Sequence, residues 1–137
     1  VDARGNLLIP ERPGNRLTFG FRNILDNGLI GLIFIVPNER ETLRVKGRAT
    51  LRKDTDQLQA MAVNGKPALM YTHVEVSECF FHCGKAMIRS KLWQPDSWGG
   101  VEKSAMVAQM ADLMGGETGL EDAIGAEIEK NYVEELY

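Results

Sequence analysis

The stretch Glu41–Lys53, ETLRVKGRATLRK, alternates small or apolar residues with polar ones over almost its whole length. Its apolar set is Leu43, Val45, Gly47, Ala49 and Leu51, and its polar set is Thr42, Arg44, Lys46, Arg48, Thr50 and Arg52. Successive side chains of a strand point to opposite faces of the sheet, so this period of two predicts a long antiparallel β-strand. One of its faces is expected to join a core, and the other is expected to be strongly cationic.

A second strand is predicted directly before this one. Leu29–Val36, LIGLIFIV, is apolar throughout and rich in β-branched residues, which is typical of a strand buried on both faces. Pro37–Arg40 separates the two segments and has the composition of a hairpin connection. The two strands are therefore expected to be neighbours in the chain joined by a tight turn.

Further elements are predicted on both sides of this hairpin. The strands are Leu7–Ile9 and Ala68–Val76, and the helices are one capped by Asn15 that runs toward Asp26 and ends at Asn27-Gly28, and one capped by Asp54 that runs through Ala62. Ser77–Trp93 fits either a short helix or a turn that enters a strand, and helix is favoured. Antiparallel strands with brief helical connections indicate an α+β, mainly β fold, a small barrel or sheet with added helices.

Charge divides the chain into a basic body and an acidic tail. Residues 1–100 hold 14 Lys and Arg against 10 Asp and Glu, whereas residues 101–137 hold 2 against 9. Helical spacing of apolar residues predicts two helices in the tail, at Lys103–Met114 and Leu120–Tyr132. The 137 residues are therefore interpreted as one domain, with a β-rich body over residues 1–100 and an acidic helical extension of it over residues 101–137.

Several function classes are disfavoured by what the sequence lacks. Its longest uninterrupted apolar stretch, Leu29–Val36, is far shorter than the roughly 20 residues that cross a bilayer, and no strong basic stripe suits a nucleic-acid duplex. We therefore expect neither a membrane nor a nucleic acid as a partner. Walker, Gly-x-Ser-x-Gly and Gly-x-Gly-x-x-Gly motifs are absent. Two cysteines are too few for a disulfide framework, which favours a reducing, cytoplasmic setting.

A zinc site could be drawn from Cys79, Cys83, His82 and His73, but the spacing disfavours it. Structural zinc sites usually present two closely spaced ligand pairs, and here one Cys-x-x-x-Cys stands with an isolated histidine. A Cys83–His82 dyad is disfavoured too, because adjacent residues of a helix point in different directions. We expect no metal, and we expect the cysteines to be small buried residues.

Three basic clusters are the most informative feature for function. Arg12, Asn15 and Arg16 flank a Pro-Gly turn that opens a helix, which is a sound place for a phosphate, although turns are commonly polar in any case. The second cluster is Arg44, Lys46 and Arg48, for which a solvated strand face is an equal alternative. The third is Lys85 and Arg89, with Trp93 nearby. Together they fit a phosphorylated, planar ligand such as flavin mononucleotide (FMN).

Four blocks resemble the flavin-binding split-barrel family related to pyridoxamine 5′-phosphate oxidase. They are LLIPERPGNRL, RNILDNGLIGLIFIVP, ETLRVKGRATL and FFHCGKAMIRSKLW, and the resemblance covers residues 1 to about 98. Their combined order and spacing is specific, and the most similar subgroup is bacterial. The resemblance implies an antiparallel split β-barrel with peripheral and C-terminal helices, and a homodimer that holds two FMN molecules at the subunit interface.

The resemblance also implies which residues contact FMN. Arg12, Asn15 and Arg16 match the segment that meets the phosphate, and Ile9 and Pro10 match a strand end that borders the flavin. Thr42 matches a position at the isoalloxazine edge where the oxidase has Gln, and Arg44 lies in the same block. The late segment that closes over the cofactor is matched loosely by His82, Lys85 and Arg89. No catalytic residue is assigned.

The implied activity is flavin-mediated hydride or electron transfer with an unknown substrate or an electron donor such as NAD(P)H. The Trp-Gln-Gly and Arg-Leu-His patterns of the oxidase are replaced here by His82-Cys83-Gly84 and Arg89-Ser90-Lys91, which disfavours oxidation of pyridoxamine phosphate itself. The alternative is a non-catalytic module that binds flavin or haem. Because members of this family carry further strands before the first block, the resemblance implies that the chain starts partway into the barrel.

Overall fold

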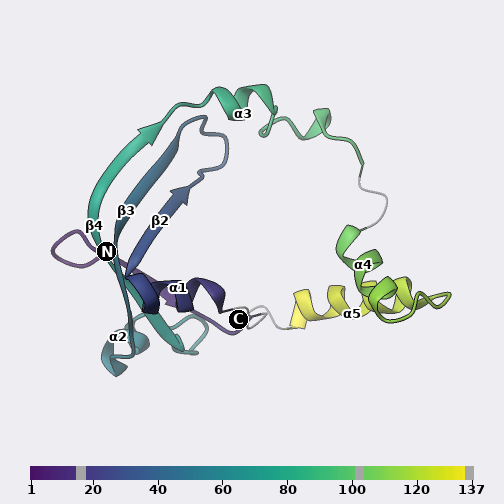
Figure 1. The fold of residues 1–137 in the computed structure, drawn as a ribbon, viewed down its shortest axis with the longest axis horizontal. Coiled ribbons are helices and arrows are strands. Elements are labelled where there is room, and N and C mark those ends of the chain that lie inside the picture. The colour runs from purple at the N-terminus through teal and green to yellow at the C-terminus, as the bar shows by residue number, and fades with distance from the viewer. Residues whose placement is uncertain (15–17, 101–103, 135–137) are drawn as a thin grey trace. The chain divides into compact units, whose positions relative to one another are not determined.

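A computed structural model describes residues 1–14, 18–100 and 104–134 of the chain (Figure 1). The chain divides into two compact units, Val1–Pro95 and Asp96–Tyr137. Among the described residues, every strand lies in the first unit, and the helices of the acidic tail lie in the second.

The first unit is an antiparallel sheet of four strands with three short helices. The strands are β1 (Leu7–Glu11), β2 (Leu29–Phe34), β3 (Thr42–Arg52) and β4 (Met70–His82), and their order across the sheet is β1-β4-β3-β2. The helices are α1 (Phe19–Asn27), α2 (Thr55–Ala60) and α3 (Lys85–Arg89). The α+β class is as predicted. Over the described residues the sheet keeps two edges, β1 and β2, and does not close into a barrel.

The alternating stretch forms the central strand β3, as predicted. Its small and apolar residues Val45, Gly47 and Ala49 are buried, while Lys46 and Arg48 between them are exposed. One residue departs from the pattern. Thr42 was expected on the exposed polar face and is buried, with 4% of its surface exposed. Its register partner is His82 at the end of β4, and its hydroxyl accepts a hydrogen bond from Arg44.

A β-bulge divides the long β3–β4 pair. The register shifts between Lys46 and Gly47, which leaves Ser77 of β4 as an extra residue, and the Ser77 hydroxyl donates to the Lys46 carbonyl at 3.2 Å. Bulges bend a strand pair and increase its twist, and both strands are visibly curved in Figure 1. Gly47 is required here, because a Cβ would lie 2.3 Å from the Glu75 carbonyl oxygen.

Helix α1 ends where the sequence predicts. Gly28 adopts the left-handed conformation with φ of 66°, and its N–H donates to the Ile24 carbonyl at 2.8 Å. This is the usual glycine stop of a helix, and it turns the chain directly into β2. The helix itself begins at Phe19, and the expected cap Asn15 lies outside the described residues.

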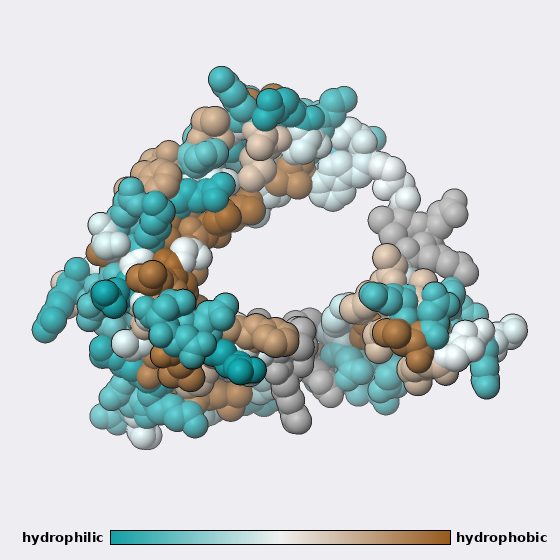
Figure 2. All heavy atoms as spheres, in the orientation of Figure 1, coloured by the Kyte–Doolittle hydropathy of each residue, from teal (hydrophilic) through white to brown (hydrophobic). Residues whose placement is uncertain are grey.

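The prediction that Leu29–Val36 is buried on both faces is wrong. The strand spans Leu29–Phe34 only, none of its residues is buried, and Leu29 and Ile33 are 62% and 56% exposed. Ile35 and Val36, which follow it, are exposed as well. The reason is the strand order: β2 lies at an edge of the sheet, where β3 is its one strand neighbour among the described residues. Figure 2 shows hydrophobic atoms open to view over the strands.

The helix favoured for Ser77–Trp93 is wrong in its first part. β4 continues to His82, and the helix α3 begins only at Lys85. Phe80 and Phe81 pair with Arg44 and Leu43 of β3, so backbone hydrogen bonding to β3 decides the conformation of a segment whose local pattern was ambiguous. Cys79 and Cys83, which were expected to be buried, are exposed free thiols.

The core of the first unit is small. Its buried hydrophobic residues are Val45, Ala49, Ala68, Tyr71 and Val74, and Val74 is fully enclosed. Most of them belong to β3 and β4, so the core lies along the central pair, and the apolar residues of β2 remain at the surface. No helix among the described residues has the length and apolar character needed to span a membrane.

The second unit pairs two helices, α4 (Ala105–Leu113) and α5 (Leu120–Glu134), which contact each other. Both were predicted, with ends that differ by a few residues. The connection contains Gly115, Gly116 and Gly119, all at positive φ. Ala111 is the buried residue of this pair. A short 3-10 helix, η1 (Pro95–Ser97), marks the junction with the first unit.

Candidate functional site

One group of predicted FMN-binding residues gathers at the hairpin end of the sheet. Thr42 at the start of β3 lies opposite His82 at the end of β4, and Arg44 lies opposite Phe80. Thr42 and Arg44 are two apart on one strand, so with their partners they share one face of the sheet. The Arg44 Nε donates to the Thr42 Oγ1 at 3.2 Å, which holds the guanidinium along this face.

Helix α3 is fixed against the tip of the β2–β3 hairpin. A Cβ on Gly84 would lie 2.6 Å from the Cβ of Arg40, so the glycine is what lets the two segments approach. The Trp93 indole N–H donates to the Glu39 carbonyl at 2.6 Å. This bond ties the segment after α3 to the hairpin.

Lys85 and Arg89 lie on α3, four residues apart and both exposed. β4 ends at His82 and α3 begins at Lys85, so the cations of α3 lie at the same end of the sheet as Thr42 and Arg44. Within the part of the chain that the structure describes, no carboxylate forms an ion pair with Arg44, Lys85 or Arg89. We call Thr42, Arg44, His82, Lys85 and Arg89 the hairpin-end group.

The rest of the predicted cationic face is partly neutralised. Lys46 Nζ lies 2.7 Å from a Glu78 carboxylate oxygen and 5.6 Å from the centre of the Phe80 ring, and Arg48 lies opposite Glu75 in the register. The alternating pattern predicted the two faces of β3, but it did not show which residues of β4 lie opposite its cations. Lys46 is therefore neutralised on this face, whereas Arg48 forms no ion pair with a carboxylate in the part of the chain that the structure describes.

The second predicted group lies at the other end of the sheet. Ile9 and Pro10 of β1 pair with Thr72 and Tyr71 of β4, close to where β3 ends. Arg12 follows β1, and its guanidinium donates to the carbonyls of Met61 and Lys66. These contacts tie Arg12 to the α2 region. Asn15 and Arg16, also predicted at the phosphate, lie outside the described residues.

The described residues of the two groups lie at opposite ends of the strands. Thr42 and Arg52 are the first and last residues of β3, and Tyr71, which pairs with Arg52, also pairs with Pro10. A strand rises about 3.3 Å per residue, so the groups lie roughly 30 Å apart along the strands.

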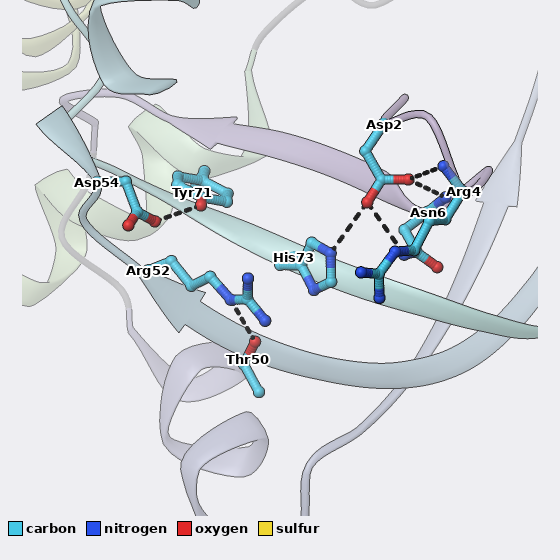
Figure 3. Close-up of polar contacts among 8 residues, drawn as sticks. All are labelled: Asp2, Arg4, Asn6, Thr50, Arg52, Asp54, Tyr71 and His73. Atoms are coloured by element: carbon cyan, nitrogen blue, oxygen red, sulfur yellow. Dashed lines mark hydrogen bonds and ion pairs between the residues drawn. The ribbon is translucent and has the colours of Figure 1, made fainter. Parts of the chain in front are cut away.

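A polar cluster that the sequence analysis did not foresee lies at this second end (Figure 3). Tyr71, 4% exposed, donates its hydroxyl to an Asp54 carboxylate oxygen at 2.5 Å, and this bond raises the pKa of Tyr71. Asp54 was predicted as a helix cap. Asp54 does precede α2, but its side chain makes no capping hydrogen bond. It accepts the hydrogen bond from the Tyr71 hydroxyl instead. Arg52 and Thr50 lie alongside on β3.

His73, a candidate zinc ligand in the sequence, belongs to the same cluster. Its Nε2 lies 3.4 Å from Asp2 Oδ2, and its Nδ1 is buried with no hydrogen-bond partner among the described residues. Asp2 also accepts the backbone N–H groups of Asn6 and Arg4, both at 2.9 Å. These hydrogen bonds hold the pKa of Asp2 far below its ordinary value, and the bond from the Asn6 backbone has the largest effect. The cluster fixes the N-terminal turn to β4.

Neither end of the sheet forms a metal centre in the described part of the chain, where no three His, Cys, Asp or Glu side chains gather closely enough to hold an ion. What the hairpin end offers is cationic groups, a hydroxyl and an imidazole on a rigid strand pair. Such a set can bind and orient an anionic ligand.

Comparison of the chain with protein-family models, with curated proteins and with solved structures finds no match.

Proposed function

We propose that this protein binds FMN and acts as a flavin-dependent oxidoreductase, as a homodimer in which each site takes residues from both chains. The observation that carries the proposal is the hairpin-end group, where cations that no carboxylate neutralises among the described residues share one rigid end of the sheet with His82 and a buried Thr42. In this proposal the open sheet is part of a split β-barrel, and the protein works in a reducing, cytoplasmic setting.

The separation of the two predicted groups supports a shared site. In this proposal the hairpin-end group of one chain contacts the flavin, and the residues around Arg12 that the resemblance assigns to the phosphate come from the partner, since the described residues of the two groups lie at opposite ends of the strands. FMN, when bound, supplies the redox chemistry by accepting a hydride from a donor such as NAD(P)H. The residues of the chain bind, orient and shield it.

Each member of the hairpin-end group has a role in this proposal. Arg44, held by Thr42, presents a guanidinium of fixed orientation to an anionic edge of the ligand, and Lys85 and Arg89 add positive charge from α3. His82 stands opposite Thr42 at the point where β4 ends. Because Gly84 and Trp93 fix α3 to the hairpin, these groups are oriented before a ligand binds.

The test is FMN affinity, measured by quenching of flavin fluorescence. Arg44→Ala removes a charge-assisted contact and should raise the Kd for FMN about tenfold or more. Arg48→Ala is the matched control, since it lies on the same strand face but opposite Glu75, and it should leave the Kd unchanged. Equal Kd values for Arg44→Ala and the unmodified chain, or no FMN binding at all, would refute the site.

Catalysis is tested on the FMN-loaded protein by adding NAD(P)H without oxygen. An oxidoreductase should lose its yellow colour as the flavin is reduced, and should regain it when an acceptor is admitted. Tight FMN binding with no bleaching by any donor would favour the alternative, a non-catalytic flavin-binding module. Binding of haem in place of FMN would point to the haem-binding form of that alternative.

A further inference from the structure

Two asparagines of the chain are followed by glycine, in the pairs Asn27-Gly28 and Asn64-Gly65. This dipeptide is chemically reactive, because the glycine nitrogen can attack the carbonyl carbon of the asparagine side chain, and the glycine has no side chain to shield that nitrogen. The attack requires that the nitrogen give up its proton and that the carboxamide reach it. The surroundings of each glycine nitrogen therefore decide which pair reacts in the folded protein.

Asn64 and Gly65 form the tip of a tight, exposed turn. Their φ angles are 51° and 75°, and positive φ at both central residues is typical of a type I′ turn. Val63 and Lys66 on either side exchange both backbone hydrogen bonds, each at 3.0 Å. Among the described residues the Gly65 N–H donates to no backbone carbonyl, and a Cβ on Gly65 would meet nothing within 4 Å. A base in the solvent therefore has access to this nitrogen.

The corresponding nitrogen after Asn27 is held by the end of α1. The Gly28 N–H donates to the Ile24 carbonyl at 2.8 Å, so the helix must open before this nitrogen can lose its proton. The Asn27 carboxamide oxygen accepts the Leu29 N–H at 2.8 Å, which fixes the side chain as well. The same dipeptide is therefore protected at this position.

Asn38 provides a second comparison, because it is also exposed and has a φ of 68°. The residue that follows it is Glu39, whose side chain shields the nitrogen and whose N–H donates to the Val36 carbonyl at 3.1 Å. Of these three asparagines, Asn64 combines an exposed turn, a following glycine and a glycine nitrogen without a backbone acceptor. Two exposed backbone hydrogen bonds close its turn, and turns of this kind open at little cost in free energy.

We propose that Asn64 is a site of spontaneous deamidation, in which the reactants are the chain itself and water. The Gly65 nitrogen loses its proton to solvent and bonds to the Asn64 Cγ. The bond from Cγ to Nδ2 breaks, and the side-chain nitrogen takes a proton from solvent and leaves as ammonia. Water then opens the resulting succinimide at either carbonyl, which gives aspartate or isoaspartate. No oxidant or reductant takes part in these steps.

The isoaspartate product opens the turn and loosens Arg12. In isoaspartate the main chain runs through the former side chain, which adds one carbon between the Cα of residue 64 and the Gly65 nitrogen. The paired hydrogen bonds of Val63 and Lys66 then no longer fit the connection. The Lys66 carbonyl accepts both the Val63 N–H and, at 3.4 Å, the Arg12 guanidinium. Deamidation therefore removes one contact that holds Arg12, and it requires no flavin.

The test is peptide mass spectrometry of the full chain after incubation in mildly alkaline buffer, both folded and unfolded in urea. In the folded chain, the Asn64 peptide should gain the mass that separates a carboxylic acid from an amide about tenfold faster than the Asn27 peptide, or more. In urea, where neither glycine nitrogen is held, the two peptides should react at similar rates. Equal rates in the folded chain, or a folded Asn64 that stays unmodified, would overturn the proposal.

Asn64→Gly is the matched variant, since Gly-Gly also suits a type I′ turn and has no carboxamide. After long incubation the unmodified chain should contain isoaspartate at residue 64, detected by enzymatic carboxyl methylation, and the Lys66 amide should lose its protection from hydrogen exchange. Asn64→Gly should show neither change. If isoaspartate forms at residue 64 while the Lys66 amide stays protected, the inferred opening of the turn is wrong.

Discussion

At the scale of single residues, several side chains have roles that their type alone does not reveal. Asp54 has the position of a helix cap, yet its carboxylate accepts the Tyr71 hydroxyl. His73 and Asp2 are 71 residues apart in the chain, and the His73 Nε2 lies 3.4 Å from the Asp2 Oδ2. Both contacts connect a segment outside the strands to the buried first part of β4.

Tyr71→Phe should destabilise the protein by about 1 kcal/mol, because it removes a hydrogen bond from a buried hydroxyl to a carboxylate that solvent partly reaches. Urea unfolding measures the change as a lower midpoint at an unaltered slope. The control is Tyr132→Phe, whose parent residue is 56% exposed, and it should be neutral. Equal midpoints for both variants would contradict the role of the Tyr71–Asp54 bond.

The Asp2 contacts predict a pH dependence of stability. The hydrogen bonds that the Asp2 carboxylate accepts lower its pKa in the folded protein below the ordinary value of 3.8. The ionised carboxylate therefore stabilises the fold at neutral pH. That contribution is lost as pH falls below 3.8 toward the folded-state pKa. Asp2→Asn should therefore be less stable than the unmodified chain near neutrality, and the difference should shrink in acid. Urea midpoints that differ equally at both pH values would contradict this.

At the scale of elements, two contacts connect the helix α3 to the hairpin of β2 and β3. The contact of Gly84 with Arg40 and the bond from Trp93 to Glu39 fix α3 to the hairpin tip. The β-bulge at Ser77 curves the strands that lead into this contact. The cations of α3 depend on this packing for their place beside Arg44.

Gly84→Ala should separate α3 from the hairpin. Its new Cβ would lie 2.6 Å from the Arg40 Cβ and 2.7 Å from the Arg40 carbonyl oxygen, so the backbone must shift. We expect a loss of about 1–3 kcal/mol of stability and a change in tryptophan fluorescence as the Trp93–Glu39 bond breaks. Gly99→Ala, where a Cβ meets nothing within 4 Å, is the control. An unchanged spectrum for Gly84→Ala would show that the contact does not position α3.

At the scale of the whole molecule, the sheet leaves several large apolar side chains exposed. Its buried hydrophobic residues lie along β3 and β4, while Ile33 and Phe34 of β2 and Phe81 at the end of β4 are exposed. The two predicted groups of FMN-binding residues lie at opposite ends of the strands. In the proposed function, the two groups are brought together from two copies of the chain.

A shared site predicts complementation between two inactive variants. Arg16→Ala and Arg44→Ala chains should each bind FMN weakly as homodimers. In a mixed dimer, one site has both substitutions and the other has neither, so about half of the normal FMN occupancy should return. The measurement is bound flavin per purified heterodimer carrying two different tags. If the site lies within one chain, each site keeps one defect and no tight binding returns.

The sequence by itself determined the elements whose signal is local. The alternation of Glu41–Lys53 predicted β3, and Asn27-Gly28 predicted the end of α1, because strand pleating and left-handed glycine are properties of a few neighbouring residues. The candidate cations Arg44, Lys85 and Arg89 could be named in the same way, although their juxtaposition could not.

Only the tertiary structure decided what covers each element and which distant residues meet. The order β1-β4-β3-β2 exposes the apolar strand β2, and pairing with β3 extends β4 through a segment that favoured helix. The contacts of Tyr71 with Asp54 and of His73 with Asp2 join residues far apart in the chain. Hydrophobicity and local pattern report the preference of a segment, whereas burial and pairing depend on neighbours that the chain brings together only when it folds.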